Sequence, residues 1–251
     1  MIKHIQLSFK IPSLDKSIFG VQTNLTNKVK AFKYPAYSRV NIEVDNGTNS
    51  DQIEVRGIND KICNIYVKAD VDALQKSTYL ELIKASYRIA QVALTELWRE
   101  KQWDINDIEA LFLEVQKEDY KCELPYFKKS KSKDLKIAAS VSMEVVKDCA
   151  NFILNVYEGG DTKRLQLIST MTNQFLFDRF FNSFYWDQEN RYVLCDREKE
   201  MFLVCDIYNL TVDIKFESKS NNESELKHFY DLLLYEEGGN NESKLYQLPL
   251  M

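Results

Sequence analysis

The strongest constraint on the fold is one long amphipathic helix, predicted for residues 77–103. Apolar residues recur there at spacings of three and four, which places them on one face of a 3.6-residue helix: Leu80, Ile83, Tyr87, Ala90, Leu94 and Trp98. A second apolar row leaves only a narrow polar strip for water: Tyr79, Leu82, Ala85, Ile89, Val92 and Ala93. Thr78 and Glu81 have the spacing of a capping box at its start. We therefore expect a long, largely buried central helix.

The length and composition of the chain allow one large domain or two smaller ones. Its 251 residues are 45% hydrophobic and 12% aromatic, which is enough to fill a substantial core. The tract KKSKSKDLK, residues 128–136, is polar and charged, as linkers often are. We therefore predict two similar-sized α+β subdomains, 1–127 and 137–251, which could also pack as one domain.

The first subdomain is predicted to combine strands with the long helix. Ile5, Leu7 and Phe9 alternate with polar residues, and residues 1–70 are β-rich by the same criterion. Asn46-Gly47 predicts one hairpin turn and residues 57–60 predict another. A second helix capped by Asp104 or Asn106 is expected to follow the long one, with a strand at 111–115 as the alternative.

The second subdomain is predicted to hold antiparallel sheets and a C-terminal helix. Residues 137–145 and 152–156 alternate and favour a hairpin, and 191–196, 201–208 and 210–216 favour a three-stranded meander. Helices are expected from 161 to 175 and from 222 to 235. Seven aromatic rings crowd into 175–186, so part of that surface should meet the other subdomain or a partner. The fold class is therefore α+β.

Charge and cysteine content limit the partners and the cellular compartment that we expect for the protein. The net charge is −5 and the pI is about 5.3, which makes nucleic acid an improbable partner. The N-terminus does not have the pattern of a secretory signal, and we expect no membrane span because no apolar run approaches 18 residues. Five scattered cysteines, an odd number, are typical of reduced thiols. We therefore expect a cytoplasmic protein.

Motifs that would identify a reaction are missing from the sequence. It contains no GxGxxG, Walker loop, GxSxG, HExxH or CxxC, and neither histidine has a ligand-spaced neighbour. We therefore expect neither a cofactor nor a bound metal. One alternative is a metal-dependent hydrolase or nuclease, in which Asp206, Asp213 and Lys215 activate water at Mg²⁺.

The leading functional hypothesis rests on negative charge beside aromatic residues. Residues 217–242 contain seven acids and two lysines, and the turn at 196–200 adds further acids. Such a surface suits a non-catalytic module that clamps a basic protein, as immunity or inhibitor proteins do; the alternative is a solvated face that keeps the chain soluble. The predicted partner-binding residues are Asp196, Glu198, Glu200, Phe184, Tyr185, Trp186, Glu236 and Glu237.

Overall fold

The structure is a computed structural model that divides into two compact units, Met1–Cys122 and Glu123–Met251. It describes residues 2–34, 37–47, 53–59, 61–134, 136–147, 149–171 and 181–217, and the single positions 224, 228, 231 and 234. Among these residues, helices and antiparallel-rich sheets confirm the α+β class. The predicted linker 128–136 is in part a strand, because β5 (Cys122–Lys131) extends through Lys131.

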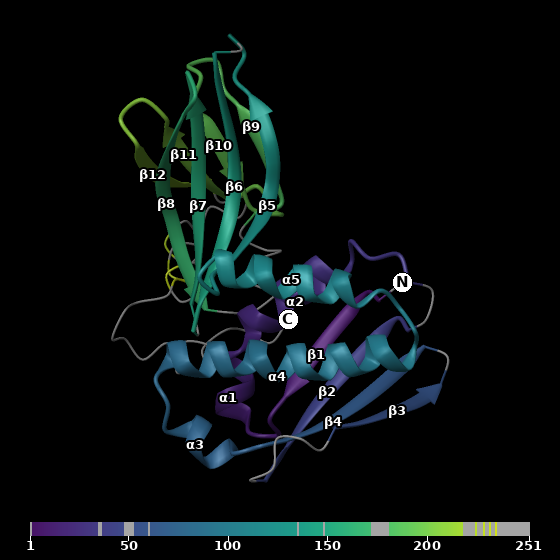
Figure 1. Cartoon of the computed structure of the whole chain (residues 1–251). Helices are drawn as coiled ribbons and strands as arrows, with labels where there is room; N and C mark the ends of the chain where they lie inside the picture. Colours follow the sequence, from purple (N-terminus) through teal and green to yellow (C-terminus); the bar gives the residue numbers. More distant parts are fainter. Residues whose placement is uncertain are drawn as a thin grey trace. The chain divides into compact units, whose positions relative to one another are not determined.

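The first unit is built on a four-stranded sheet with the order β1-β2-β4-β3 (Figure 1). Its strands are β1 (His4–Ser8), β2 (Arg39–Asn46), β3 (Ile53–Asn59) and β4 (Ile62–Ala69). The β3–β4 hairpin is antiparallel, as predicted. The hairpin predicted at Asn46-Gly47 is wrong, because β2 pairs with β4 in parallel and β3 lies at the edge of the sheet. The sheet is therefore mixed.

Two helices that the β-rich prediction missed join β1 to β2. They are α1 (Pro12–Ser17) and α2 (Phe19–Val29). Buried residues recur at spacings of three and four through both helices and through Ile18 between them: Leu14, Ile18, Val21, Leu25 and Val29. A parallel pair of strands needs such a crossover, because a tight turn cannot connect strands that run in the same direction.

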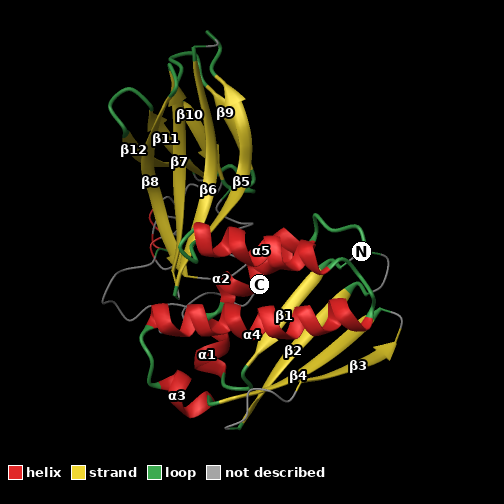
Figure 2. Ribbon diagram, viewed as in Figure 1, coloured by secondary structure: helices red, strands yellow, loops and turns green. Residues whose placement is uncertain are grey.

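The long helix is confirmed as α4 (Tyr79–Glu100), which crosses the sheet of the first unit (Figure 2). The Thr78–Glu81 capping box is present. Tyr87 is 1% exposed and Trp98 is fully buried, but Leu80 is 51% exposed and Val92 39% exposed. One residue of each predicted apolar row, Leu80 in the first and Val92 in the second, is therefore left uncovered by the sheet and the neighbouring helices.

Two shorter helices flank α4. They are α3 (Val71–Gln75), which precedes it, and α5 (Ile105–Lys117), which follows it. The Asp104 side chain accepts a hydrogen bond from the Asn106 amide at the start of α5, so the helical prediction is confirmed over the strand alternative. Within the described residues, no helix is long and apolar enough to cross a membrane.

The second unit contains two four-stranded sheets. One has the order β5-β6-β7-β8, in which β6 (Ile137–Val146), β7 (Cys149–Glu158) and β8 (Asp161–Met171) follow β5. The other has the order β12-β11-β10-β9, made of β9 (Ser183–Trp186), β10 (Tyr192–Cys195), β11 (Met201–Asp206) and β12 (Thr211–Phe216). The β6–β7 hairpin and the β10–β11–β12 meander are confirmed.

The helix predicted for 161–175 is wrong over its described part, which is strand β8. Gly159 and Gly160, with φ of +58° and +98°, turn the chain back alongside β7. A register shift places Leu165 opposite Leu154 and Ile168 opposite Phe152, so two residues three apart lie on one face of the sheet. That spacing imitates a helix.

Aromatic rings pack inside the second unit. The Phe152 ring lies 4.5 Å from the Phe181 ring and 5.1 Å from the Tyr126 ring, measured between centroids. Residues 183–186 of the aromatic stretch form a strand, and 175–180 lie outside the described residues. So does the predicted C-terminal helix, apart from the single positions given above.

Candidate binding surfaces

Asp196, one of the predicted partner-binding residues, is the first residue of the β10–β11 turn. It is 1% exposed, and its carboxylate accepts hydrogen bonds from the backbone N–H groups of Glu200 at 2.7 Å, Met201 at 3.0 Å and Glu198 at 3.3 Å. These bonds hold the tight turn closed. Glu198 is exposed and Glu200 half-buried, so only these two of the three acids have side chains that reach solvent.

Two of the three predicted aromatic contacts point into the second unit. The Phe184 ring stacks on Tyr192 with 5.2 Å between centroids, and the Trp186 indole donates to the Ser130 hydroxyl at 3.1 Å. Tyr185 lies between them on the strand, so its side chain points to the opposite face, where it is 48% exposed. Glu236 and Glu237 lie outside the described residues.

Tyr185 belongs to a corner of the β9–β12 sheet that also carries Tyr208. Tyr192 is opposite both Trp186 and Cys205, so the end of β9 and the β11–β12 turn meet at one end of the sheet. Tyr208, in that turn, is 59% exposed. We call this region, with the acids around Arg191, the acidic corner: Tyr185, Asp187, Glu189, Arg191, Asp206 and Tyr208.

Negative charge exceeds positive charge in the acidic corner. The single Arg191 guanidinium pairs with Asp187 at 2.7 Å and with Glu189 at 3.1 Å. Hydrogen bonds from the Asn209 backbone and side chain lower the pKa of Asp206, with smaller contributions from the Tyr208 amide and from Arg191. Burial opposes ionisation of Asp187, but the hydrogen bonds from Arg191 prevail and lower its pKa. Three carboxylates thus face one cation.

The alternative catalytic residues share one sheet face but do not converge. Asp206 is opposite Thr211, so Asp213 is two residues further along β12 and Lys215 four. At about 3.4 Å per residue, Lys215 is roughly 14 Å along the strand from Asp206. The Asp206 carboxylate also accepts bonds from Tyr208 and Asn209 of its own turn. Across the part of the chain that the structure describes, no three His, Cys, Asp or Glu side chains are grouped as metal ligands.

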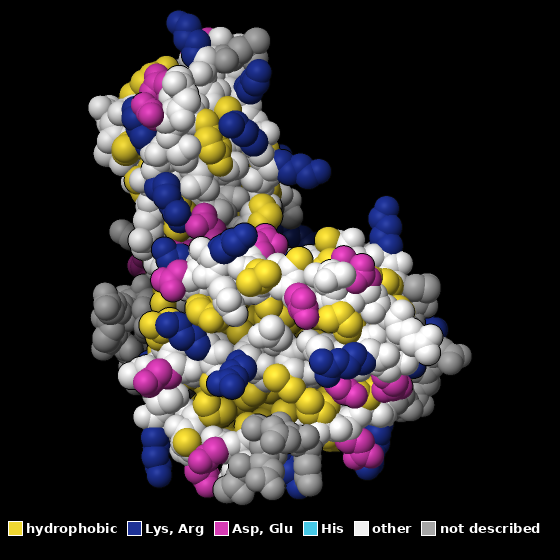
Figure 3. Space-filling model, in the orientation of Figure 1, with side chains coloured by type: hydrophobic (Ala, Val, Ile, Leu, Met, Phe, Trp, Pro, Cys, Tyr) yellow, Lys and Arg dark blue, Asp and Glu magenta, His cyan; other side chains and the backbone are white. Residues whose placement is uncertain are grey.

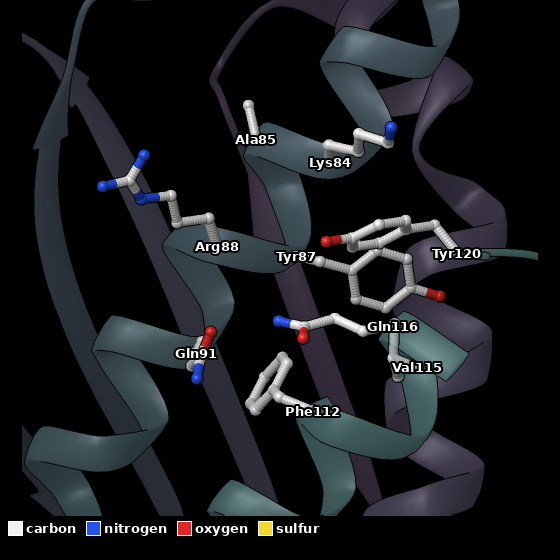
Figure 4. A pocket seen from close by; sticks show the side chains of 9 residues that line it. All are labelled: Lys84, Ala85, Tyr87, Arg88, Gln91, Phe112, Val115, Gln116 and Tyr120. Carbon is white, nitrogen blue, oxygen red and sulfur yellow. The ribbon is translucent and has the colours of Figure 1, made fainter. Parts of the chain in front are cut away.

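A different site, not singled out from the sequence, lies between α4 and α5. We call it the α4–α5 pocket; its volume is about 470 Å³, and it is lined by Lys84, Ala85, Tyr87, Arg88, Gln91, Phe112, Val115, Gln116 and Tyr120 (Figure 4). The buried Tyr87 ring forms part of its wall. The Tyr87 hydroxyl is held in place because it accepts a hydrogen bond from the Asn24 side chain at 2.8 Å. The Lys84 ammonium lies 5.5 Å from the centre of the Tyr120 ring.

A second hollow lies beside α4. This α3–α4 groove has a volume of about 420 Å³ and is lined by Val67, Lys68, Ala69, Asp70, Ala73, Leu74, Ala85, Arg88, Ile89 and Val92. Figure 3 shows apolar side chains gathered on this face of the first unit, with basic side chains beside them. The α4–α5 pocket and the α3–α4 groove share Ala85 and Arg88.

Comparison of the chain with protein-family models, curated proteins and solved structures gave no match. Its function must therefore be argued from its own surfaces. Of these, the acidic corner was partly anticipated through Tyr185. The sequence pattern places Ala85 in the second apolar row, which predicts burial, and it does not show that α5 and α3 form hollows on either side of this residue.

Proposed function

We propose that the chain is a non-catalytic, cytoplasmic protein-binding module that holds a partner with a basic surface, in the manner of an immunity or inhibitor protein. The observation that carries the proposal is the acidic corner, where two exposed tyrosines stand beside an excess of carboxylates. Exposed tyrosines are frequent anchors in protein interfaces, and carboxylates steer a cationic partner toward them.

The distribution of charge along the chain supports this proposal. The first unit has 17 acidic and 17 basic residues, whereas the second has 21 acidic and 16 basic residues, so the whole net charge of −5 belongs to the second unit. Within residues 181–217 there are eight acids and four basic residues. A basic partner would therefore be attracted to the second unit more than to the first. Five cysteines scattered along the sequence fit a reducing compartment.

The experiment is affinity capture followed by a binding titration. The immobilised chain is exposed to a lysate of its source cells, the captured protein is identified and purified, and its Kd is measured for wild type, Tyr185→Ala and Tyr208→Ala. Each tyrosine truncation is expected to weaken binding about tenfold, as loss of an interface anchor does. Glu189→Gln should weaken it less, and raising the salt from 0.1 to 0.5 M should weaken wild-type binding.

Matched controls lie on α5 in the first unit. Leu113→Ala removes an apolar side chain that is 55% exposed, and Glu109→Gln neutralises an exposed acid. Both are expected to leave the Kd unchanged. A captured partner whose affinity is insensitive to salt and to both tyrosine truncations would refute the proposed role of the acidic corner.

A further inference from the structure

The two hollows beside α4 are separated by a low point in the surface of that helix. Ala85 lines both of them and has only a methyl group as a side chain. Its neighbours along the exposed face of α4, Lys84 and Arg88, are long. A partner segment could therefore cross α4 over Ala85 and reach into the α4–α5 pocket on one side and the α3–α4 groove on the other. We call this crossing point the Ala85 saddle.

Each hollow offers apolar surface to a side chain of such a segment. In the α3–α4 groove, Val92 is 39% exposed although it is apolar, and Ile89 and Leu74 are half-buried beside it. In the α4–α5 pocket the half-buried Ala85 and the half-buried Tyr120 ring supply the accessible apolar surface, and the buried rings of Tyr87 and Phe112 also line it. One apolar side chain on each side of the saddle would cover these surfaces.

The charges around the saddle are positive. Lys84 and Arg88 are one helical turn apart and exposed, and Lys68 lines the groove. No salt bridge to these three side chains is present among the described residues. The one acid in either lining, Asp70, caps α3 by accepting a hydrogen bond from the Ala73 amide at 2.9 Å. An acidic group over the saddle would thus meet cations from α4.

Two amides favour a peptide over a simple organic acid. Gln91 and Gln116 line the α4–α5 pocket, and Figure 4 shows the Gln116 amide lying between the Tyr87 and Phe112 rings. No hydrogen bond from either side chain occurs within the described part of the chain. Carboxamides pair with the N–H and C=O groups that an extended peptide leaves free. In the same view the Arg88 guanidinium points away from the two tyrosines, so it remains accessible on the far side of the saddle.

We propose that the Ala85 saddle binds an extended acidic segment of a partner protein, with one apolar side chain in each hollow and a carboxylate between them on Arg88 and Lys84. A helix with its side chains is about 10 Å wide, and four residues of extended chain span about 13 Å. Apolar residues four apart, with the acid midway, therefore fit the crossing. The site is independent of the acidic corner and has the opposite charge preference.

The test uses a defined probe, the peptide acetyl-Leu-Ser-Asp-Ser-Leu-amide, titrated into the isotopically labelled full chain and followed by NMR. We expect amide shifts in α4 around residues 85–92 and on both sides of it, around residues 67–74 in the α3–α4 groove and 112–116 in the α4–α5 pocket. Replacing Asp by Asn in the peptide should weaken binding at least threefold, and replacing both leucines by serine should abolish it. Arg88→Gln should remove the preference for Asp over Asn.

Two variants isolate the saddle itself. Ala85→Leu places a larger side chain at the crossing point and keeps a good helix former, so it should weaken binding of the peptide at least fivefold. Arg99→Gln neutralises another exposed arginine of α4 and should change nothing. An unchanged affinity in Ala85→Leu, or equal binding of the Asp and Asn peptides, would overturn the proposal. So would shifts confined to one hollow, equal binding of acetate alone, or self-association through α4 seen by sedimentation.

Discussion

Removal of the Asp196 carboxylate should destabilise the second unit although it is a single turn residue. The carboxylate accepts three backbone N–H bonds. In Asp196→Ala the Glu198 amide can rehydrate because that residue is exposed, but Met201 is 1% exposed and its amide loses an acceptor. A buried N–H donor that is left without an acceptor costs about 1–3 kcal/mol of stability, and each lost hydrogen bond to a charged group costs more. We therefore expect the substitution to lower the stability of the second unit by about 3 kcal/mol in total.

Asp196→Asn provides a graded comparison. It keeps the oxygen that accepts from Glu200 and Met201 but loses the charge, so it should cost about 1 kcal/mol. The assay is native-state amide hydrogen exchange, because one unfolding free energy is not defined for a chain with two compact units. Amides of β11 should exchange roughly 100-fold faster in Asp196→Ala, while amides of β2 should not change.

The matched control is Glu198→Ala, which alters an exposed acid of the same turn. It should change stability by less than about 0.5 kcal/mol. If Asp196→Ala exchanged no faster than Glu198→Ala, the buried-acceptor reasoning would be wrong and a role for Asp196 at the surface would have to be reconsidered.

Three further outcomes are expected. Thr78→Ala should destabilise the first unit by about 1 kcal/mol in exchange measurements on α4, because its capping box is lost; an unchanged α4 would contradict this. Gly160→Ala should cost about 1–2 kcal/mol in the exchange of β7 and β8, since φ is +98° there, whereas an exposed Ala110→Ser should cost less. Burial raises the pKa of Cys205 to about 12, so iodoacetamide at pH 8 should modify the half-buried Cys149 first; early labelling of Cys205 would refute this.

The elements predicted correctly are those whose signal is local. The helices α4 and α5 have long 3.6-residue patterns and capping residues at their first turns, and the β10–β12 meander has alternation interrupted by polar turns. Residues 12–29 have a helical spacing through Leu14, Ile18 and Leu25, but the alternation around Ile5 favours a β-rich prediction for all of residues 1–70.

Other features depend on contacts that sequence spacing does not encode. The bulge in β8 gives a strand the three-residue spacing of a helix. In the sequence, Asp196 looks like any acid of an exposed polar turn. Only the structure of that turn shows that its carboxylate oxygens accept hydrogen bonds from backbone N–H groups. Likewise, Ala85 separates two hollows only because α3 and α5 lie on either side of α4.

The position of β3 at the sheet edge has a consequence for folding kinetics. Chain order favours an early hairpin between β2 and β3, yet in the native sheet β4 lies between these two strands and pairs with both. A premature β2–β3 hairpin would have to dissociate first, so it would act as a kinetic trap. Refolding of the first unit should therefore be slower than its size alone implies, and strengthening the turn at Asn46-Gly47 should slow it further.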